Sequence, residues 1–336
     1  MPSQPARSRV TLTDISSRAW EHPADRGALV ALRKLKGFDA VLKALSGLVS
    51  ERAVRLELLG SAIRVDERQF ATIHRLLTEV CTVLDASHVP ELYVSANPVP
   101  AAVTIGMDKP VIVLNSGLVD LLDEDELSFV VGHELGHALS GHAVYQTLLQ
   151  RLIRLSAVLT AVPVGGLGIR LIMAALMEWS RKAELSADRA GLLATQEPAV
   201  AFRAHMKLAS GGHLEDLDQT SFFDQGREYD EAGDVRDSVL KMLLIEARSH
   251  PFAVVRASEL RRWVDSGDYT ALLGGGYPRR GDDETASATE AAREAAQSYS
   301  DTFRQTQDTV GRLVHDAAGF VGSVVGWIDQ NLRRPS

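Results

Sequence analysis

The stretch Val130–Ala138 reads VVGHELGHA and contains the pattern HExxH inside an apolar run. On an α-helix, residues i and i+4 share one face, so His133 and His137 can direct their imidazoles at one metal ion. Glu134 lies beside the first histidine, where its carboxylate can accept a proton from a water molecule that the metal activates. Gly136 would leave room beside the metal. The apolar flanks favour a metal-binding core helix over a helix that carries two unrelated histidines.

A catalytic zinc site needs three protein ligands and one open position. The third histidine of a metzincin would stand six residues after His137, but that position is Ala143. His142 comes one place too early and would point elsewhere on a helix. The remaining possibility is a glutamate from a second helix, and the candidates are Glu178, Glu184 and Glu197.

Glu184 is favoured because Asp188 follows it by one helical turn on the same face, and the small Ala183 and Ala187 leave space around it. Asp188 could then accept a hydrogen bond from a ligating histidine and fix its tautomer. Without the HExxH pattern, these carboxylates would be interpreted as an exposed acidic face among Arg181, Lys182 and Arg189. With it, a two-helix metal site is the better interpretation.

Residues 133–137 (HELGH) and 184–191 (ELSADRAG) together resemble the M48 metallopeptidase family, which includes HtpX-like and Ste24-like proteases. The resemblance extends from about residue 58 to residue 264. It implies a gluzincin-type, zinc-dependent endopeptidase that binds one Zn²⁺ per chain. The residues it assigns are His133, His137 and Glu184 as ligands and Glu134 as the general base.

The resemblance also covers a His-Pro pair, His250-Pro251, and an arginine downstream of it, Arg256. In related sites the later histidine donates to the developing oxyanion, so His250 is the catalytic candidate here. A loop histidine that precedes a proline is the alternative interpretation. Arg256, like Asp188, is expected to support the ligands from behind.

The sequence predicts an α+β fold that is predominantly helical, a zincin-type metallopeptidase with a small β-sheet beside the HExxH helix. Strands are expected at 92–94, 101–106 and 111–114. The acidic residues 123–126 should cap the helix that follows them. If 101–106 is the edge strand above the site, its backbone would bind an extended peptide, with contacts at Ala101, Ala102 and Val103.

Composition divides the chain into four segments. These are a helical N-terminal extension at 1–57, the metallopeptidase domain at 58–272, a flexible linker at 273–308 and an amphipathic C-terminal helix at 309–336. Residues 1–22 are polar and contain prolines, and we expect them to be poorly ordered.

Residues 152–177 are strongly apolar, but a proline and several glycines interrupt them before they reach the length of a spanning helix. We therefore expect two helices folded back on each other. Packing in the core and partial exposure to a membrane surface both remain open for this hairpin.

A net charge of −8 and the lack of a Lys/Arg tract argue against nucleic-acid binding. The single cysteine, Cys81, excludes an internal disulfide and a cysteine-based zinc site. No secretory signal is visible, so a cytoplasmic location is expected, with contact at the inner face of the membrane through 152–177 or 309–334 left open. A homo-oligomer is left open as well.

Polypeptides are the expected substrates, with protein quality control as a setting. The alternative is a membrane-associated or zinc-stabilised binding module, similar to a chaperone, with little proteolysis. The intact Glu134 favours the protease, because a purely structural zinc site has no need of a base.

Overall fold

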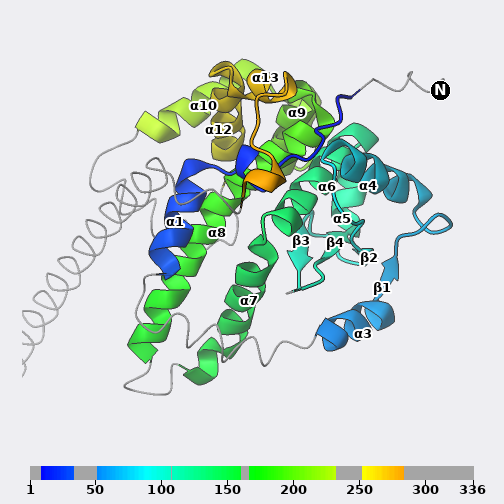
Figure 1. The fold of residues 1–336 in the computed structure, drawn as a ribbon, viewed down its shortest axis with the longest axis vertical. Coiled ribbons are helices and arrows are strands. Elements are labelled where there is room, and N and C mark those ends of the chain that lie inside the picture. The colour runs from blue at the N-terminus through cyan, green and yellow to red at the C-terminus, as the bar shows by residue number, and fades with distance from the viewer. Residues whose placement is uncertain (1–8, 34–50, 107, 160–165, 232–251, 284–336) are drawn as a thin grey trace, which may run out of the picture.

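A computed structural model describes residues 9–33, 51–106, 108–159, 166–231 and 252–283 (Figure 1). Helices surround a small sheet, as expected for a predominantly helical α+β fold. The helices are α1 Pro23–Arg33, α3 Glu51–Ser61, α4 Ala71–Val83, α5 Ser116–Leu121, α6 Glu124–Leu139, α7 His142–Leu159, α8 Gly166–Thr195, α9 Pro198–Ser210, α10 Gln219–Glu231, α12 Ala253–Asp265 and α13 Asp268–Leu273. The strands are β1 Ala62–Arg64, β2 Leu92–Ser95, β3 Ala102–Ile105 and β4 Val111–Asn115.

The sheet has the strand order β1-β2-β4-β3. β2 and β4 are parallel, whereas β1 pairs with β2 and β3 pairs with β4 in antiparallel fashion. Side chains alternate between the two faces of a strand, so Leu92 and Ile112 enter the main core while Tyr93 and Val113 pack with Leu58 of α3. The three strands predicted from the sequence are confirmed, and β3 is an edge strand.

Helix α6 carries the HExxH pattern and lies in the middle of the molecule, between the sheet and α8 (Figure 1). Its residues 126–137 are all buried, as expected for a helix that is apolar on most sides. At its start, Asp123 accepts from the Glu126 backbone N–H, and the Glu126 carboxylate accepts from the Asp123 backbone N–H. This capping box confirms the predicted role of the acidic cluster.

A close crossing between α6 and α8 sets the distance between the two helices. A Cβ atom on Gly136 would lie 2.5 Å from the Ala190 Cβ, and one on Gly132 would lie 2.6 Å from the Ala194 Cβ. The expectation that Gly136 leaves room beside a metal is therefore wrong. The space is filled by α8, and the small residues on both helices allow the close approach that brings their side chains together.

The segment predicted as a helical hairpin forms α7 and α8, although residues 160–165 between them are outside the described part of the chain. α8 continues without a break from Gly166 to Thr195. Leu149 and Leu152 of α7 pack with Leu176 and Trp179 of α8, and Leu32 of α1 joins the same cluster. Among the described helices, none has both the length and the apolar character that crossing a bilayer requires.

The prediction that residues 1–22 are poorly ordered is wrong for residues 9–22. Leu12, Ile15 and Trp20 are at most 2% exposed and belong to the main core. The backbone N–H of Ser16 donates to Pro278 O, which joins this segment to the start of the predicted linker. Three well-spaced apolar residues are enough to anchor a segment of turns and one short 3-10 helix, and such a segment shows no periodicity in the sequence. The predicted C-terminal helix 309–336 lies outside the described residues.

Candidate metal centre

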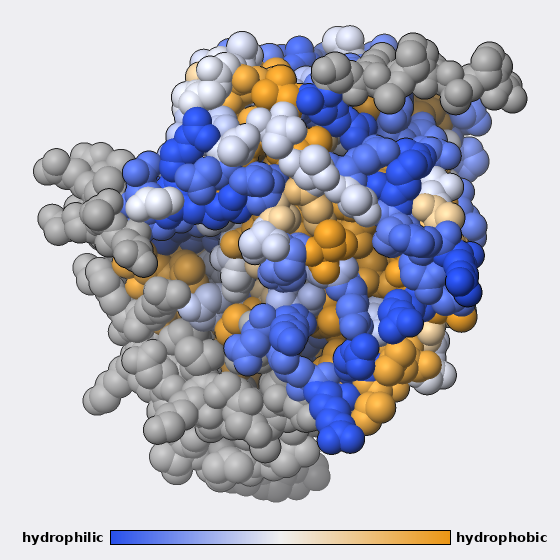
Figure 2. Space-filling view, turned by 45° about the vertical axis from the view of Figure 1, so that its right-hand side comes forward, coloured by the Kyte–Doolittle hydropathy of each residue, from blue (hydrophilic) through white to orange (hydrophobic). Residues whose placement is uncertain are grey.

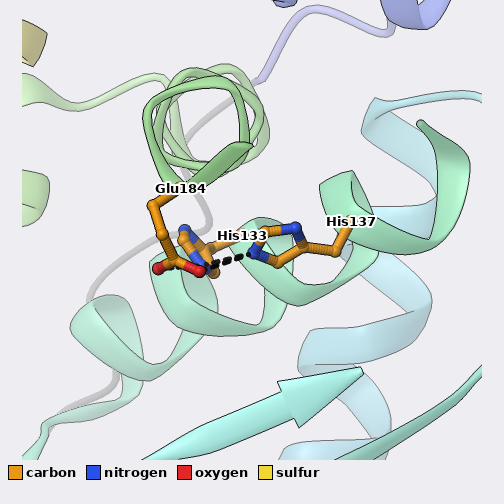
Figure 3. Close-up of side chains that lie close together, drawn as sticks. All are labelled: His133, His137 and Glu184. Atoms are coloured by element: carbon orange, nitrogen blue, oxygen red, sulfur yellow. Dashed lines mark hydrogen bonds and ion pairs between the residues drawn. The ribbon is translucent and has the colours of Figure 1, made fainter. Parts of the chain in front are cut away.

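The side chains of His133, His137 and Glu184 converge at the crossing of α6 and α8 (Figure 3). The Nε2 atoms of the two histidines are 3.1 Å apart. Glu184 places Oε2 at 3.5 Å from His133 Nε2 and Oε1 at 3.3 Å from His137 Nε2. All three residues are buried, with exposures between 2% and 5%.

These separations can be compared with those that a metal ion requires. Ligand atoms about 2.0–2.2 Å from a tetrahedral zinc ion lie about 3.3–3.6 Å from one another. Of the three observed separations, 3.3 and 3.5 Å fall within that range and 3.1 Å is slightly shorter. Two imidazole nitrogens and one carboxylate are also a donor set that zinc prefers in catalytic sites. The residues therefore fit a catalytic metal ion.

The other two candidate glutamates lie away from this point. Glu178, on α8, forms ion pairs with Arg181 and with Lys182, whose Nζ is 3.7 Å from Glu178 Oε1. Glu197 precedes the first residue of α9. Only Glu184 faces α6 beside the two histidines, because the glycine and alanine contacts of the crossing fix the rotation of α8 about its axis.

Asp188 and Arg256 lie behind the first histidine. His133 Nδ1 is 3.0 Å from Asp188 Oδ1, so the ring donates its Nδ1–H there and keeps the Nε2 lone pair for a metal. Arg256, on α12, donates from Nε to Asp188 Oδ2 at 2.7 Å and places Nη1 at 3.1 Å from Glu184 Oε2. Burial by itself would raise the pKa of Asp188, but the charge of Arg256 holds that pKa well below its usual range. The Asp188 side chain is therefore ionised at neutral pH.

When no metal is bound, the two histidines differ in their pKa values. Burial acts to lower the pKa of His133, but hydrogen bonds to Asp188 and Glu184 outweigh it and raise that pKa to about 9. Burial lowers the pKa of His137. A cation that binds here must therefore displace a proton from His133, whereas His137 is already neutral.

Glu134, the expected base, is held by a hydroxyl group from the sheet. Thr104 Oγ1, on β3, lies 2.7 Å from Glu134 Oε2 and 2.9 Å from the Glu134 backbone oxygen. Its single proton goes to the carboxylate, which is the stronger acceptor. A threonine in a strand carries no signal of such a contact, because only the packing of β3 against α6 creates it.

The remaining candidate residues fall into two groups. Ala101, Ala102 and Val103 are half-buried at the beginning of the edge strand β3. His250, the candidate oxyanion donor, lies outside the described residues.

The chain is similar to known peptidases over most of its length. Residues 67–264 match the sequence model of peptidase family M48. The plastoglobule-localized metallopeptidase 48 of Arabidopsis thaliana chloroplasts is 35% identical over 270 residues, which cover 77% of this chain and 76% of the relative. Protease HtpX of Xanthomonas oryzae pv. oryzae is 24% identical over 71% of this chain and 88% of its own length. No solved structure gives a significant match.

Proposed function

The chain belongs to peptidase family M48 and is a metallopeptidase, and from this premise we propose that one zinc ion, held by His133, His137 and Glu184, serves the hydrolysis of polypeptides. The observation that carries the proposal is the convergence of two Nε2 atoms and one carboxylate at separations that suit a tetrahedral ion.

The chemistry of the site follows from the groups around it. When bound, zinc acts as a Lewis acid that acidifies a water molecule and polarises a peptide carbonyl. Glu134 accepts the proton of the attacking water and returns it to the leaving amine. Thr104 holds the carboxylate of Glu134 in place, while Asp188 and Arg256 orient His133 and Glu184. His250 remains the proposed donor to the oxyanion.

We propose that an extended peptide binds along the outer edge of β3, beside Ala101, Ala102 and Val103. Among the described strands, β3 pairs only with β4, so its other edge can accept a further strand. Main-chain hydrogen bonds along such an edge hold a peptide without selecting its side chains. β3 also packs on α6, so a peptide bound along its edge would lie near Glu134.

Metal content and peptide cleavage test the proposal together. The purified full chain should contain about one zinc per molecule and should cleave casein or a fluorogenic peptide. A chelator should abolish the cleavage and added zinc should restore it. A protein that contains zinc but cleaves no peptide under any condition would contradict the assigned activity.

Replacing Thr104 with valine should lower kcat about 10- to 150-fold, because a hydrogen bond to a charged group is worth about 1.5–3 kcal/mol. Valine keeps the shape of threonine, so the strand and its packing should be preserved. Thr104→Ser retains a hydroxyl and is the matched control, with a kcat close to that of the wild type. Equal kcat values for the valine and serine variants would show that the contact has no role in catalysis.

We also propose how the chain is divided and where the protein acts. The domain boundaries lie at residues 57, 272 and 308. The protein is cytoplasmic, forms a homo-oligomer and contacts a membrane surface through 152–177 or 309–334. Ile153 on α7 is 42% exposed, and Figure 2 shows hydrophobic residues among hydrophilic ones on one face of the molecule. Flotation of the full chain with liposomes would test the membrane contact, and light scattering would test the oligomer.

A further inference from the structure

His142 lies directly behind the second metal-ligand candidate. It is the first residue of α7, 3% exposed, and its Nδ1 is 3.0 Å from His137 Nδ1. Gly141 precedes it with φ +70°, a conformation that favours glycine and turns the chain sharply between α6 and α7. The side-chain amide of Gln146 lies farther from the same nitrogen of His137, at 3.4 Å.

The other ring nitrogen of His142 reaches the N-terminal helix. His142 Nε2 is 3.1 Å from Oδ2 of Asp25, on α1. Asp25 is 2% exposed and accepts two more hydrogen bonds, both from α8: Ser186 Oγ at 2.6 Å and Trp179 Nε1 at 2.9 Å. Side chains from α1, α7 and α8, which lie side by side in Figure 1, therefore meet behind His137.

These contacts determine where the protons lie. The carboxylate of Asp25 can only accept, so His142 donates its Nε2–H to it. His142 Nδ1 is then the bare nitrogen and accepts the Nδ1–H of His137. His137 consequently keeps the lone pair of Nε2, the atom that faces His133 and Glu184. The contacts of Asp25 thus select the one tautomer of His137 that can bind a metal.

Charge gives a second reason to connect Asp25 with the metal. A buried carboxylate is costly unless positive charge compensates it. Within the described residues, the side chain of Asp25 contacts a hydroxyl, an indole and the His142 imidazole, with no lysine or arginine among its partners. The imidazoles of His142 and His137 connect this carboxylate to the point where a divalent cation would bind.

We propose that Asp25 and His142 are positioning residues that orient His137 and raise the affinity of the site for zinc. The inference rests on the proposed zinc site and extends it to α1, which precedes the segment matched by the family model. The first histidine ligand has its own carboxylate, Asp188, in direct contact. The second histidine, His137, would be connected to its carboxylate, Asp25, through the imidazole of His142.

Zinc affinity, measured by competition with a chromogenic chelator on the full chain, tests this proposal without relying on activity. Asp25→Asn and His142→Phe should each weaken zinc binding about 10- to 100-fold, as removal of such supporting contacts does elsewhere. The double variant should have about the same zinc affinity as the single variant with the lower affinity, because both changes break the same chain of contacts. His142→Gln should restore most of the affinity, since its amide can donate to Asp25 and accept from His137.

Two controls separate positioning from a purely structural role. Leu149→Ala removes an apolar side chain from the buried cluster that joins α7 to α1 and α8, and it should lower the stability of the metal-free protein while leaving zinc affinity near the wild-type value. Glu21→Gln changes a carboxylate near α1 that pairs with Arg26 and should affect neither.

The outcomes distinguish the two proposals. A wild-type chain that binds no zinc would overturn the proposed function together with this inference. If the wild type binds zinc and the Asp25→Asn and His142→Phe variants bind it equally well, only the inference fails. It also fails if Leu149→Ala weakens zinc binding as much as Asp25→Asn does. Should Asp25→Asn fail to fold, equal affinities for His142→Phe and His142→Gln would overturn it.

Discussion

Replacing Glu134 with glutamine is expected to lower kcat by about 100- to 10,000-fold, the range that a general base contributes. The amide has the size of the carboxylate but cannot accept a proton from water. Thr104 can still donate to the amide oxygen, so the side chain should keep its position. Zinc content and the unfolding temperature should remain close to those of the wild type. Steady-state kinetics on a fluorogenic peptide, with metal analysis of the same sample, measures the effect.

Glu124→Gln is the matched control for this substitution. Glu124 is on the same helix, but it is exposed and pairs with Arg75, so its neutralisation should leave kcat unchanged. If the Glu134→Gln variant hydrolysed peptides at the wild-type rate, Glu134 could not be the base.

Replacing Glu184 with alanine is expected to remove stoichiometric zinc, and the peptidase activity with it. Two imidazoles alone leave a zinc site without the third protein ligand that catalytic sites have. His137→Ala should have the same consequence for the same reason. Elemental analysis after dialysis against metal-free buffer would measure zinc per chain.

Glu178→Ala provides the control on the same helix. Glu178 forms ion pairs on α8 with Arg181 and Lys182, and its loss should leave zinc bound. Retention of zinc by the Glu184→Ala variant, with loss of zinc from the Glu178→Ala variant, would refute the proposed ligand set.

The elements that the sequence predicted well are those whose signals are local. The HExxH pattern places two histidines on one face of a helix wherever that helix lies, because the spacing of four residues is a property of the helix itself. The capping box at Asp123 and Glu126 is equally local. The three strands were predicted because short β-rich runs alternate with turn residues over a few positions.

The sequence was less informative where a segment has no period of its own. Residues 9–22 were expected to be poorly ordered, but Leu12, Ile15 and Trp20 bury completely in a core made by distant residues. The prediction that Gly136 leaves room beside a metal was also wrong. Its neighbour is Ala190 on α8, more than 50 residues later in the chain.

The amino-acid sequence by itself determined which groups could form the proposed site: two histidines and one glutamate on one helix, with a second glutamate on another. Only the tertiary structure decided which groups hold those residues in place. Thr104 reaches Glu134 because β3 packs on α6, and Asp25 reaches His142 because α1 packs on α8. The physical reason is that helical spacing acts over one turn, whereas these hydrogen bonds join residues 30 and 117 positions apart, which only the packing of whole elements brings together.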